Sequence, residues 1–300
     1  MSVIVVGSLN LDLVAEVAHL PARGETLLAS GHARALGGKG ANQAVSAARH
    51  GVDVAMVGCV GADAEGRALT GALAAEGIDV SGIGARDDVA TGVAHITVDP
   101  EGANTIVVVP GANGRLGAAD VRDELSRLPA ADVVLVQLEI PLDAVIAAAE
   151  TASARVVLNP APARELPHEL LRQVDVLVPN APELGALTGG GVPSTVREVA
   201  ARARLLAGGC AVVVTMGESG ALVVAGEETT HVPAPRVDAI DTTGAGDAFC
   251  GSLAAGIAGG LSLVGAVHDA VRVASRSTMR RGALEALPTA GEISALLAGG

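Results

Sequence analysis

Short aliphatic, β-branched runs alternate along this chain with alanine-rich stretches, and this alternation restricts the fold more than any other feature. The apolar runs occupy residues 3–6, 54–57, 133–136, 156–158, 176–178 and 212–215. Helical patterns lie between them, for example at residues 41–50, 67–76, 142–152 and 196–207. Nearly continuous apolar strands are typical of a parallel sheet buried on both faces. The alternation therefore predicts a doubly wound α/β fold, a mostly parallel sheet flanked by helices.

Two segments, 13–36 and 91–109, depart from this rhythm because their strand patterns are shorter and alternate more. In the second segment, the turn Asp99-Pro100-Glu101-Gly102 separates two strand-like runs, which is a hairpin signal. We expect both segments to form a small antiparallel β sheet outside the main layer. Because the chain has no low-complexity linker, residues 1–300 are expected to form one domain with these segments inserted in it.

The composition indicates an aliphatic core and disfavours some partners. Half of the residues are hydrophobic, 18% are charged, Trp and Tyr are absent, and Phe249 is the single Phe. The chain therefore lacks the aromatic platform on which single-stranded nucleic acid stacks. The net charge of -13 argues against nucleic acid and anionic membranes as partners.

The cysteines and the N-terminal residues indicate the cellular compartment of the protein. Cys59, Cys210 and Cys250 are scattered without C-x-x-C spacing, which favours buried thiols in a reducing compartment. The sequence opens on an apolar strand pattern, without the basic region or long hydrophobic span of a signal peptide or membrane anchor. We expect a cytoplasmic protein.

The run DTTGAGDAF at residues 241–249 carries the strongest chemical signal. It places Gly244, Gly246 and Asp247 at the start of a small-residue helical pattern. A helix N-terminus attracts anions through its free N–H groups and dipole, and glycines let a phosphate approach the backbone. Asp247 could then take a proton from an attacking hydroxyl, which suits phosphoryl transfer. The alternative is a glycine-rich loop in which Asp247 only caps the helix.

The run GGKGANQA at residues 37–44 opens a second helical pattern. It is not a Walker A loop, because Gly40 follows Lys39 where Ser or Thr would bind Mg²⁺. The two glycines, Lys39 and Asn42 still make a polar nest that can form hydrogen bonds with hydroxyls. By itself this run favours a structural tight turn.

Together these runs resemble the ribokinase branch of the PfkB carbohydrate kinase family. VVGSLNLD at residues 5–12 is similar to the family's first strand, which ends in Asn10 and Asp12. PARGET at 21–26, NPAPARELP at 159–167 and the N-x-x-E element at 180–183 follow in the family's order. The resemblance covers essentially the whole chain. It implies a ribokinase-like fold whose β lid closes over the sugar and pairs with a second subunit in a homodimer.

The resemblance also implies a sugar site. Its members would be Asn10, Asp12, Gly38, Lys39, Asn42, Glu139 and Asp247. Asp12 would be the main hydroxyl acceptor, although a lone carboxylate there could be a solvated turn residue. Lys39 could instead be a surface charge, and Glu139 could cap a helix. His95 is expected to face the sugar, where the family usually has an aliphatic side chain.

An ATP site is implied as well. Its contacts would be Asn180, Thr215, Met216, Gly217, Glu218, Ser219, Gly220, Gly246 and Asp247. Glu183 is similar to the acid that organises Mg²⁺ through water, but Asn180 and Glu183 could also form a capping box. The amides of Gly244, Ala245, Gly246 and Asp247 would form an anion hole. Val271 replaces a polar residue commonly found beside adenine.

The family uses a monovalent cation, usually K⁺, beside the anion hole. The matching positions are Asp241, Thr243, Ser277, Arg280 and Gly282, most of which would act through backbone carbonyls. The last ligand position, normally a serine, aligns with Ala286. Because alanine has no hydroxyl, weaker K⁺ binding is expected.

The activity implied by the resemblance is ATP-dependent phosphorylation of D-ribose at its 5-hydroxyl, with Asp247 as the general base. A kinase for another pentose, a nucleoside or a sugar acid remains open. A non-catalytic sugar or nucleotide sensor would normally lose Asp247, Gly244 or Gly246, and all three are present. A dinucleotide-dependent oxidoreductase is disfavoured because no G-x-G-x-x-G follows the first strand.

Overall fold

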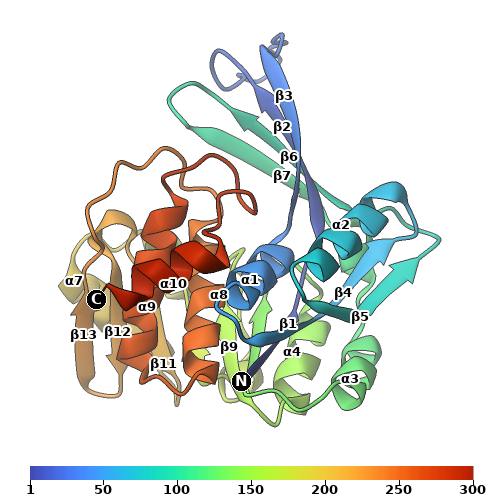
Figure 1. The fold of residues 1–300 in the computed structure, drawn as a ribbon. Helices are drawn as coiled ribbons and strands as arrows, with labels where there is room; N and C mark the ends of the chain where they lie inside the picture. The colour runs from blue at the N-terminus through green and yellow to red at the C-terminus, as the bar shows by residue number, and fades with distance from the viewer. Residues whose placement is uncertain (300) are drawn as a thin grey trace.

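A computed structural model describes residues 1–299, and in it the alternating pattern forms one large sheet (Figure 1). The strand order is β13-β12-β11-β10-β9-β8-β1-β4-β5. In chain order these strands are β1 (Ser2–Val6), β4 (Asp53–Gly61), β5 (Asp79–Arg86), β8 (Val133–Gln137), β9 (Arg155–Asn159), β10 (Val176–Leu177), β11 (Ala211–Thr215), β12 (Ala221–Ala225) and β13 (Glu228–Val232). Neighbours are parallel from β5 to β11, and β12 and β13 add an antiparallel edge. The predicted α/β class is confirmed.

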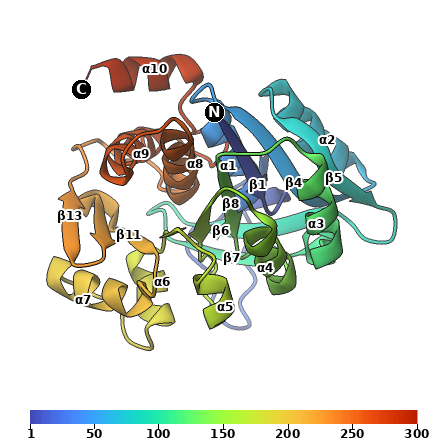
Figure 2. The same ribbon diagram turned by 90° about the horizontal axis from the view of Figure 1, so that it is seen from below.

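Helices cover both faces of this sheet, as Figure 2 shows. Within β1, Val3 and Val5 belong to one hydrophobic cluster, whereas Ile4 and Val6 belong to the other. The first cluster contains residues of α1 (Lys39–Ala48), α2 (Ala64–Ala75), α8 (Ala245–Ala258) and α9 (Leu263–Ser277). The second contains residues of α3 (Ala118–Arg127), α4 (Leu142–Thr151), α5 (His168–Leu171), α6 (Ala181–Leu187) and α7 (Val196–Leu206). Successive strand residues point to opposite faces, so each apolar strand supplies both clusters.

Two 3-10 turns and a C-terminal helix complete the body. The turns are η1 (Gly111–Arg115) and η2 (Gly217–Ser219), and α10 (Ala290–Ala298) packs against α9. Cys59, Cys210 and Cys250 are buried and free, as the sequence predicts. Among residues 1–299, no helix combines the length and the apolar character that a membrane crossing requires.

The helices α1 and α8 approach each other closely because small residues face each other. A Cβ on Gly251 would lie 2.4 Å from the backbone oxygen of Gln43 and 2.6 Å from the Cβ of Ser46. The Ser46 hydroxyl also donates a hydrogen bond of 2.8 Å to the backbone oxygen of Ala248. This contact places the N-terminal turns of the two helices side by side.

A small second sheet stands away from the body (Figure 1). Its strand order is β3-β2-β6-β7, and its strands are β2 (Asn10–Glu16), β3 (Gly31–Gly37), β6 (Gly92–Val98) and β7 (Asn104–Val109). The β6–β7 hairpin is confirmed, and β2–β3 is antiparallel too, whereas β2 and β6 run parallel. We call this sheet the lid.

The lid begins earlier than residue 13. Because β1 ends at Val6 and β2 begins at Asn10, the expected position of Asn10 and Asp12 at the end of the first strand is wrong. Both residues lie in a lid strand. The three residues between the strands turn the chain, where the amide of Gly7 still donates to the backbone oxygen of Val57.

Candidate active site

The predicted sugar-site residues converge where the lid meets the N-terminal turns of α1 and α8. Asn10, Asp12, Asn42 and Asp247 are all buried, although each carries a polar group. They come from β2, α1 and α8, which are far apart in the chain. Buried polar groups are costly unless they have partners, so their concentration at one place indicates a binding site.

Asp247 is held by two side chains of α1. Asn42 Nδ2 donates to one carboxylate oxygen of Asp247 and Gln43 Nε2 to the other, each at 3.0 Å. The capping alternative fails, because Gly244 is the N-cap residue of α8 and no side chain among residues 1–299 caps that first turn. The carboxylate therefore faces the sugar-side helix.

Asp12 and Lys39 lie in a strongly charged environment. Burial, followed by the negative charges of Glu139, Asp247 and Glu285, raises the pKa of Asp12 to about 7. Asp247 raises the pKa of Lys39 against the effect of burial, with smaller contributions from Glu139 and Glu183. Lys39 is therefore the cation of an acidic cluster and not a solvated surface charge.

Glu139 is oriented from both sides. Its Oε2 accepts hydrogen bonds from the Ser8 hydroxyl at 2.5 Å and from the backbone amide of Lys39 at 3.2 Å. Arg164 Nη2 donates to the backbone oxygens of Leu138 and Ile140, at 2.5 and 2.8 Å, and so fixes the chain around Glu139. The carboxylate thus binds the first turn of α1 while it lies next to the proposed sugar position.

Asn10 is held by a residue that the sequence did not indicate. Asn113 Nδ2 donates to Asn10 Oδ1 at 2.8 Å, and the same side chain bonds both backbone groups of Leu9. A Cβ on Gly92 would lie 2.3 Å from both Asn10 Oδ1 and Asn113 Nδ2. Only glycine leaves room for this pair of amides.

The expected position of His95 is wrong. In the β2–β6 register, Asp12 pairs with Ala94 and Leu13 pairs with His95. Paired residues share a face and neighbours alternate, so His95 lies on the face opposite Asp12. Ala94 and Ile96 occupy the face of Asp12 instead, where aliphatic side chains were expected.

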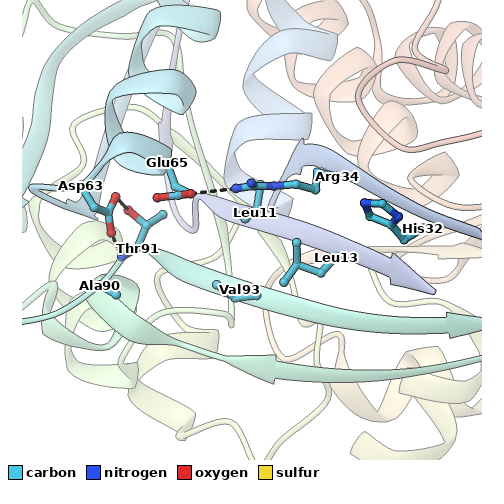
Figure 3. Close-up of a pocket in the computed structure, with 9 residues that line it drawn as sticks. All are labelled: Leu11, Leu13, His32, Arg34, Asp63, Glu65, Ala90, Thr91 and Val93. Atoms are coloured by element: carbon cyan, nitrogen blue, oxygen red, sulfur yellow. Dashed lines mark hydrogen bonds and ion pairs between the residues drawn. The ribbon is translucent and has the colours of Figure 1, made fainter.

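Figure 3 shows a hollow of about 380 Å³ against the lid. The strand register places it on the face opposite Asp12. It is lined by Leu11, Leu13, His32, Arg34, Asp63, Glu65, Ala90, Thr91 and Val93. Arg34 pairs with Glu65 across it at 2.7 Å. Because Asn10 and Asp12 point away from this hollow, it is not the site of the predicted sugar contacts.

The predicted nucleotide residues form a second group. Asn180 caps α6, where its side chain accepts from the Glu183 amide at 2.7 Å and Glu183 accepts from the Asn180 amide at 2.8 Å. Asn180 and Glu183 therefore form the capping box that the sequence offered as an alternative. Glu183 also lies near enough to Asp247 and Lys39 to interact with their charges. Burial raises the pKa of Glu183. The Asn180 backbone bridges to Thr215, where the predicted loop begins.

The loop Thr215-Met216-Gly217-Glu218-Ser219-Gly220 depends on glycine at two positions. Gly217 and Gly220 have φ values of 57° and 87°. A Cβ on Gly220 would also lie 2.1 Å from the backbone oxygen of Val232. The loop is thus a tight turn, and its residues 217–219 are exposed.

The first turn of α8 has the features of an anion site. Gly244 has a φ of 74°, and a Cβ there would lie 3.0 Å from Ala283 Cα. The Ala245 amide donates to the backbone oxygen of Thr242 at 3.2 Å. Open space surrounds the Cβ position of Gly246 among the described residues, so a phosphate could approach the amides of Gly246 and Asp247.

The predicted cation residues come together beside this turn. Burial opposes ionisation of Asp241, but the backbone amides of Gly282 and Thr243 donate to it and lower its pKa. The amide of Asp241 in turn donates to the backbone oxygen of Thr278. The structure therefore joins the 241–243 loop to residues 277–282. Ala286 is fully buried.

The side chains of Arg280 and Ser277 are engaged elsewhere. Arg280 and Arg276 both pair with Glu292, and these bonds together with the Thr289 amide lower the pKa of Glu292 to about 2. The Ser277 hydroxyl donates to the backbone oxygen of Ala274 at 2.8 Å. A cation here would therefore meet the Asp241 carboxylate and backbone oxygens, which are ligands that hard cations accept.

Comparison with known proteins agrees with this geometry. The model of the pfkB family carbohydrate kinases matches residues 1–290. The chain belongs to the PfkB family. It is 38% identical to the ribokinase of Haemophilus influenzae, with 95% of this chain and 94% of that protein covered. It is 37% identical to a Salmonella typhimurium deoxyribokinase, with 96% of both covered. The structure of Arabidopsis thaliana ribokinase complexed with ribose and ATP has a TM-score of 0.87 and 30% identity, covering 98% of both chains.

Several residues that hold the predicted site side chains were not singled out in the sequence. Gln43, Asn159 and Arg164 stand inside runs that the sequence already marked, so their motifs could have pointed to them. Ser8 likewise stands inside the marked run at residues 5–12, whereas Asn113 had no such signal. Both act through contacts with residues more than 100 positions away.

Replacing Asp12 with Asn should stabilise the ligand-free protein and impair sugar binding. The pKa of Asp12 is raised in the folded protein, so folding favours its protonated form. The contribution of Asp12 to folding stability is therefore fully present below pH 3.8 and is lost as pH rises through about 7. Each pKa unit corresponds to about 1.4 kcal/mol, so the advantage of Asp12→Asn should grow from pH 4 to pH 8. Thermal unfolding across this range measures it.

Asp63→Asn is the matched control. Burial opposes ionisation of Asp63, but hydrogen bonds from Thr91 and Gly66 lower its pKa. Its removal should therefore cost stability as pH rises above the ordinary range of an aspartate. If Asp12→Asn were no more stable than the wild type at pH 8, the environment described for Asp12 would be incorrect.

Proposed function

We propose that this protein transfers the γ-phosphoryl group of ATP to the 5-hydroxyl of D-ribose. The observation that carries the proposal is the buried Asp247 carboxylate at the N-terminus of α8, held by Asn42 and Gln43 from the sugar-side helix. The names of the relatives support ribose as substrate, and one neighbouring structure holds ribose and ATP.

Different residues would carry out proton transfer, charge stabilisation and sugar binding. Asp247 would take the proton of the sugar hydroxyl, and the amides at the start of α8 would stabilise the charge on the transferring group. Asn10, Asp12, Lys39, Asn42 and Glu139 would bind the other hydroxyls. Closure of the lid would exclude water, which competes with the sugar for the phosphoryl group.

Mg²⁺ and K⁺ are part of the proposal. Within residues 1–299, no group of three His, Cys, Asp or Glu side chains is gathered as a metal site. Glu183 would help to hold Mg²⁺ through water, and the ion would supply positive charge that neutralises the phosphates of the nucleotide. K⁺ would bind near Asp241 and the adjacent backbone oxygens, where it would fix the shape of the anion-binding turn.

Other sugars are close alternatives. The similarity to a deoxyribokinase makes 2-deoxyribose an alternative substrate. Nucleosides and sugar acids are further alternative substrates. A sensor on the same fold would bind sugar or nucleotide without releasing ADP. A coupled ADP-release assay over pentoses, 2-deoxyribose, hexoses and nucleosides separates these possibilities. Turnover that is highest with a substrate other than ribose would contradict the proposed substrate.

Asp247→Asn should lower kcat by about 10²- to 10⁴-fold, because that is the usual contribution of a positioned general base. The side chains have nearly the same shape, so folding and ATP affinity should persist. Single-turnover kinetics and nucleotide titration measure the two effects separately. Near wild-type turnover in a folded variant would remove Asp247 from the role of base.

Ala286→Ser should lower the K⁺ concentration needed for half-activation. A hard cation gains an oxygen ligand if the added hydroxyl reaches it. The measurement is a K⁺ titration of activity at constant ionic strength for both proteins, with Na⁺ in place of K⁺ as the comparison. Activity indifferent to K⁺ in both proteins would contradict a cation site. Equal half-activation would show that Ala286 is not the ligand position.

We also propose a cytoplasmic homodimer joined through the lid. The free, buried thiols support a reducing compartment. The edge strand β7 exposes apolar residues on both faces, with Ile106, Val107, Val108 and Val109 exposed by 51, 65, 41 and 50%. Exposed apolar edge strands commonly pair with another chain.

A Val107→Glu, Val109→Lys double variant should weaken the dimer, because charges then replace apolar side chains on one face of β7. Sedimentation velocity at several protein concentrations measures the change. Val196→Glu is the control, since Val196 is 44% exposed on α7, away from the lid. A wild type that sediments as a monomer at every concentration would rule out the dimer.

A further inference from the structure

Gln43 is a fully buried glutamine that joins two polar side chains. Its Nε2 lies 3.0 Å from an Asp247 carboxylate oxygen and 3.2 Å from Asn159 Oδ1. An NH₂ group has two protons, so it can donate to both acceptors at once. Gln43 follows the predicted sugar contact Asn42 directly, but it is not itself one of the predicted sugar contacts.

The orientation of the Gln43 amide is fixed by its neighbours. Asn159 Nδ2 donates to the backbone oxygen of Val178 at 2.9 Å, so Asn159 must present its oxygen to Gln43. An ionised Asp247 carboxylate only accepts. Both partners therefore require the NH₂ group of Gln43, and a flipped amide would set oxygen against oxygen on both sides. The base is thereby linked through Gln43 to β9 and to the chain that leads into Asn180.

We propose that Gln43 is a positioning residue for the general base. This role rests on the proposed kinase function. Gln43 would hold the Asp247 carboxylate in one rotamer while Asn42 releases Asp247 and binds the sugar. With Gln43 in place, the carboxylate keeps a charge-stabilising donor on one oxygen and presents the other to the substrate hydroxyl. Because α1 and α8 are already in close contact near Gly251, Gln43 completes a rigid attachment of the base to the sugar-side helix.

The test replaces Gln43 with Met, which keeps the length of the side chain and removes the amide. We expect kcat to fall by about 10- to 100-fold, the effect of one lost hydrogen bond to a charged group, with both KM values within about twofold. The acidic limb of the kcat profile should move to higher pH, because the carboxylate loses a donor that favours its charged form. A purely structural role would not move this limb.

Gln137→Met is the matched control. Gln137 is also a fully buried glutamine, but it donates to the backbone oxygen of Val6 and does not contact Asp247. Its loss should leave kcat and the pH profile unchanged. If Gln43→Met behaved like the wild type, or if Gln137→Met produced the same change, the positioning role would be overturned.

Gln43→Glu covers the case in which the Met variant does not fold. This variant keeps the shape and places two carboxyl groups about 3 Å apart, where they share one proton. Its acidic limb should therefore move far toward alkaline pH, and an unmoved limb would overturn the role. A wild type that releases no ADP with any sugar would overturn the proposed function and this role together, whereas an active wild type with an unaffected Gln43 variant would overturn the role alone.

Discussion

The close contact between α1 and α8 is the constraint on which the site depends. A side chain at Gly251 would collide with the backbone of α1, and the Ser46 hydroxyl bonds the first turns of α8. Two helix N-termini are thereby fixed next to each other, and the amides of Lys39 and Gly40 in the first turn of α1 donate to Glu139 and Ser8. One helix supplies Lys39 and Asn42, and the other supplies Asp247. The chemistry is thus positioned by small residues that carry none of it.

Electrostatics explains why this arrangement is costly without ligands. The charges of Asp247, Glu139 and Glu183 act on a single lysine, Lys39, in a protein whose net charge is already -13. Glu139 and Asp247 also act on the buried Asp12. Hydrogen bonds from Asn42, Gln43 and Ser8 offset part of the repulsion. Sugar hydroxyls, which donate to carboxylates, would relieve more of it. A binding site of this kind is less stable when empty, because its polar groups are arranged for a partner.

Alternate residues of the lid strand β2 point to opposite faces of the lid. Along β2, Asn10 and Asp12 face the site, whereas Leu11 and Leu13 face the hollow next to α2. The same alternation places Ala94 with the site and His95 on the outer face. One strand therefore contributes polar side chains to the candidate site on one face and leucines to the hollow on the other, and a shift of one residue would exchange the two faces.

The sequence by itself determined the elements and most of the chemical groups. Strand and helix follow from local periodicity, and the motifs around Lys39 and Asp247 mark helix starts, since turn and cap chemistry is local. It could not place His95, Asn113 or the hollow, and it assigned Asn10 and Asp12 to the wrong strand. Only the tertiary structure decided that Gln43 would contact Asp247, 204 positions away. Such contacts depend on strand order, register and helix packing, which arise from the whole chain and from no single segment of it.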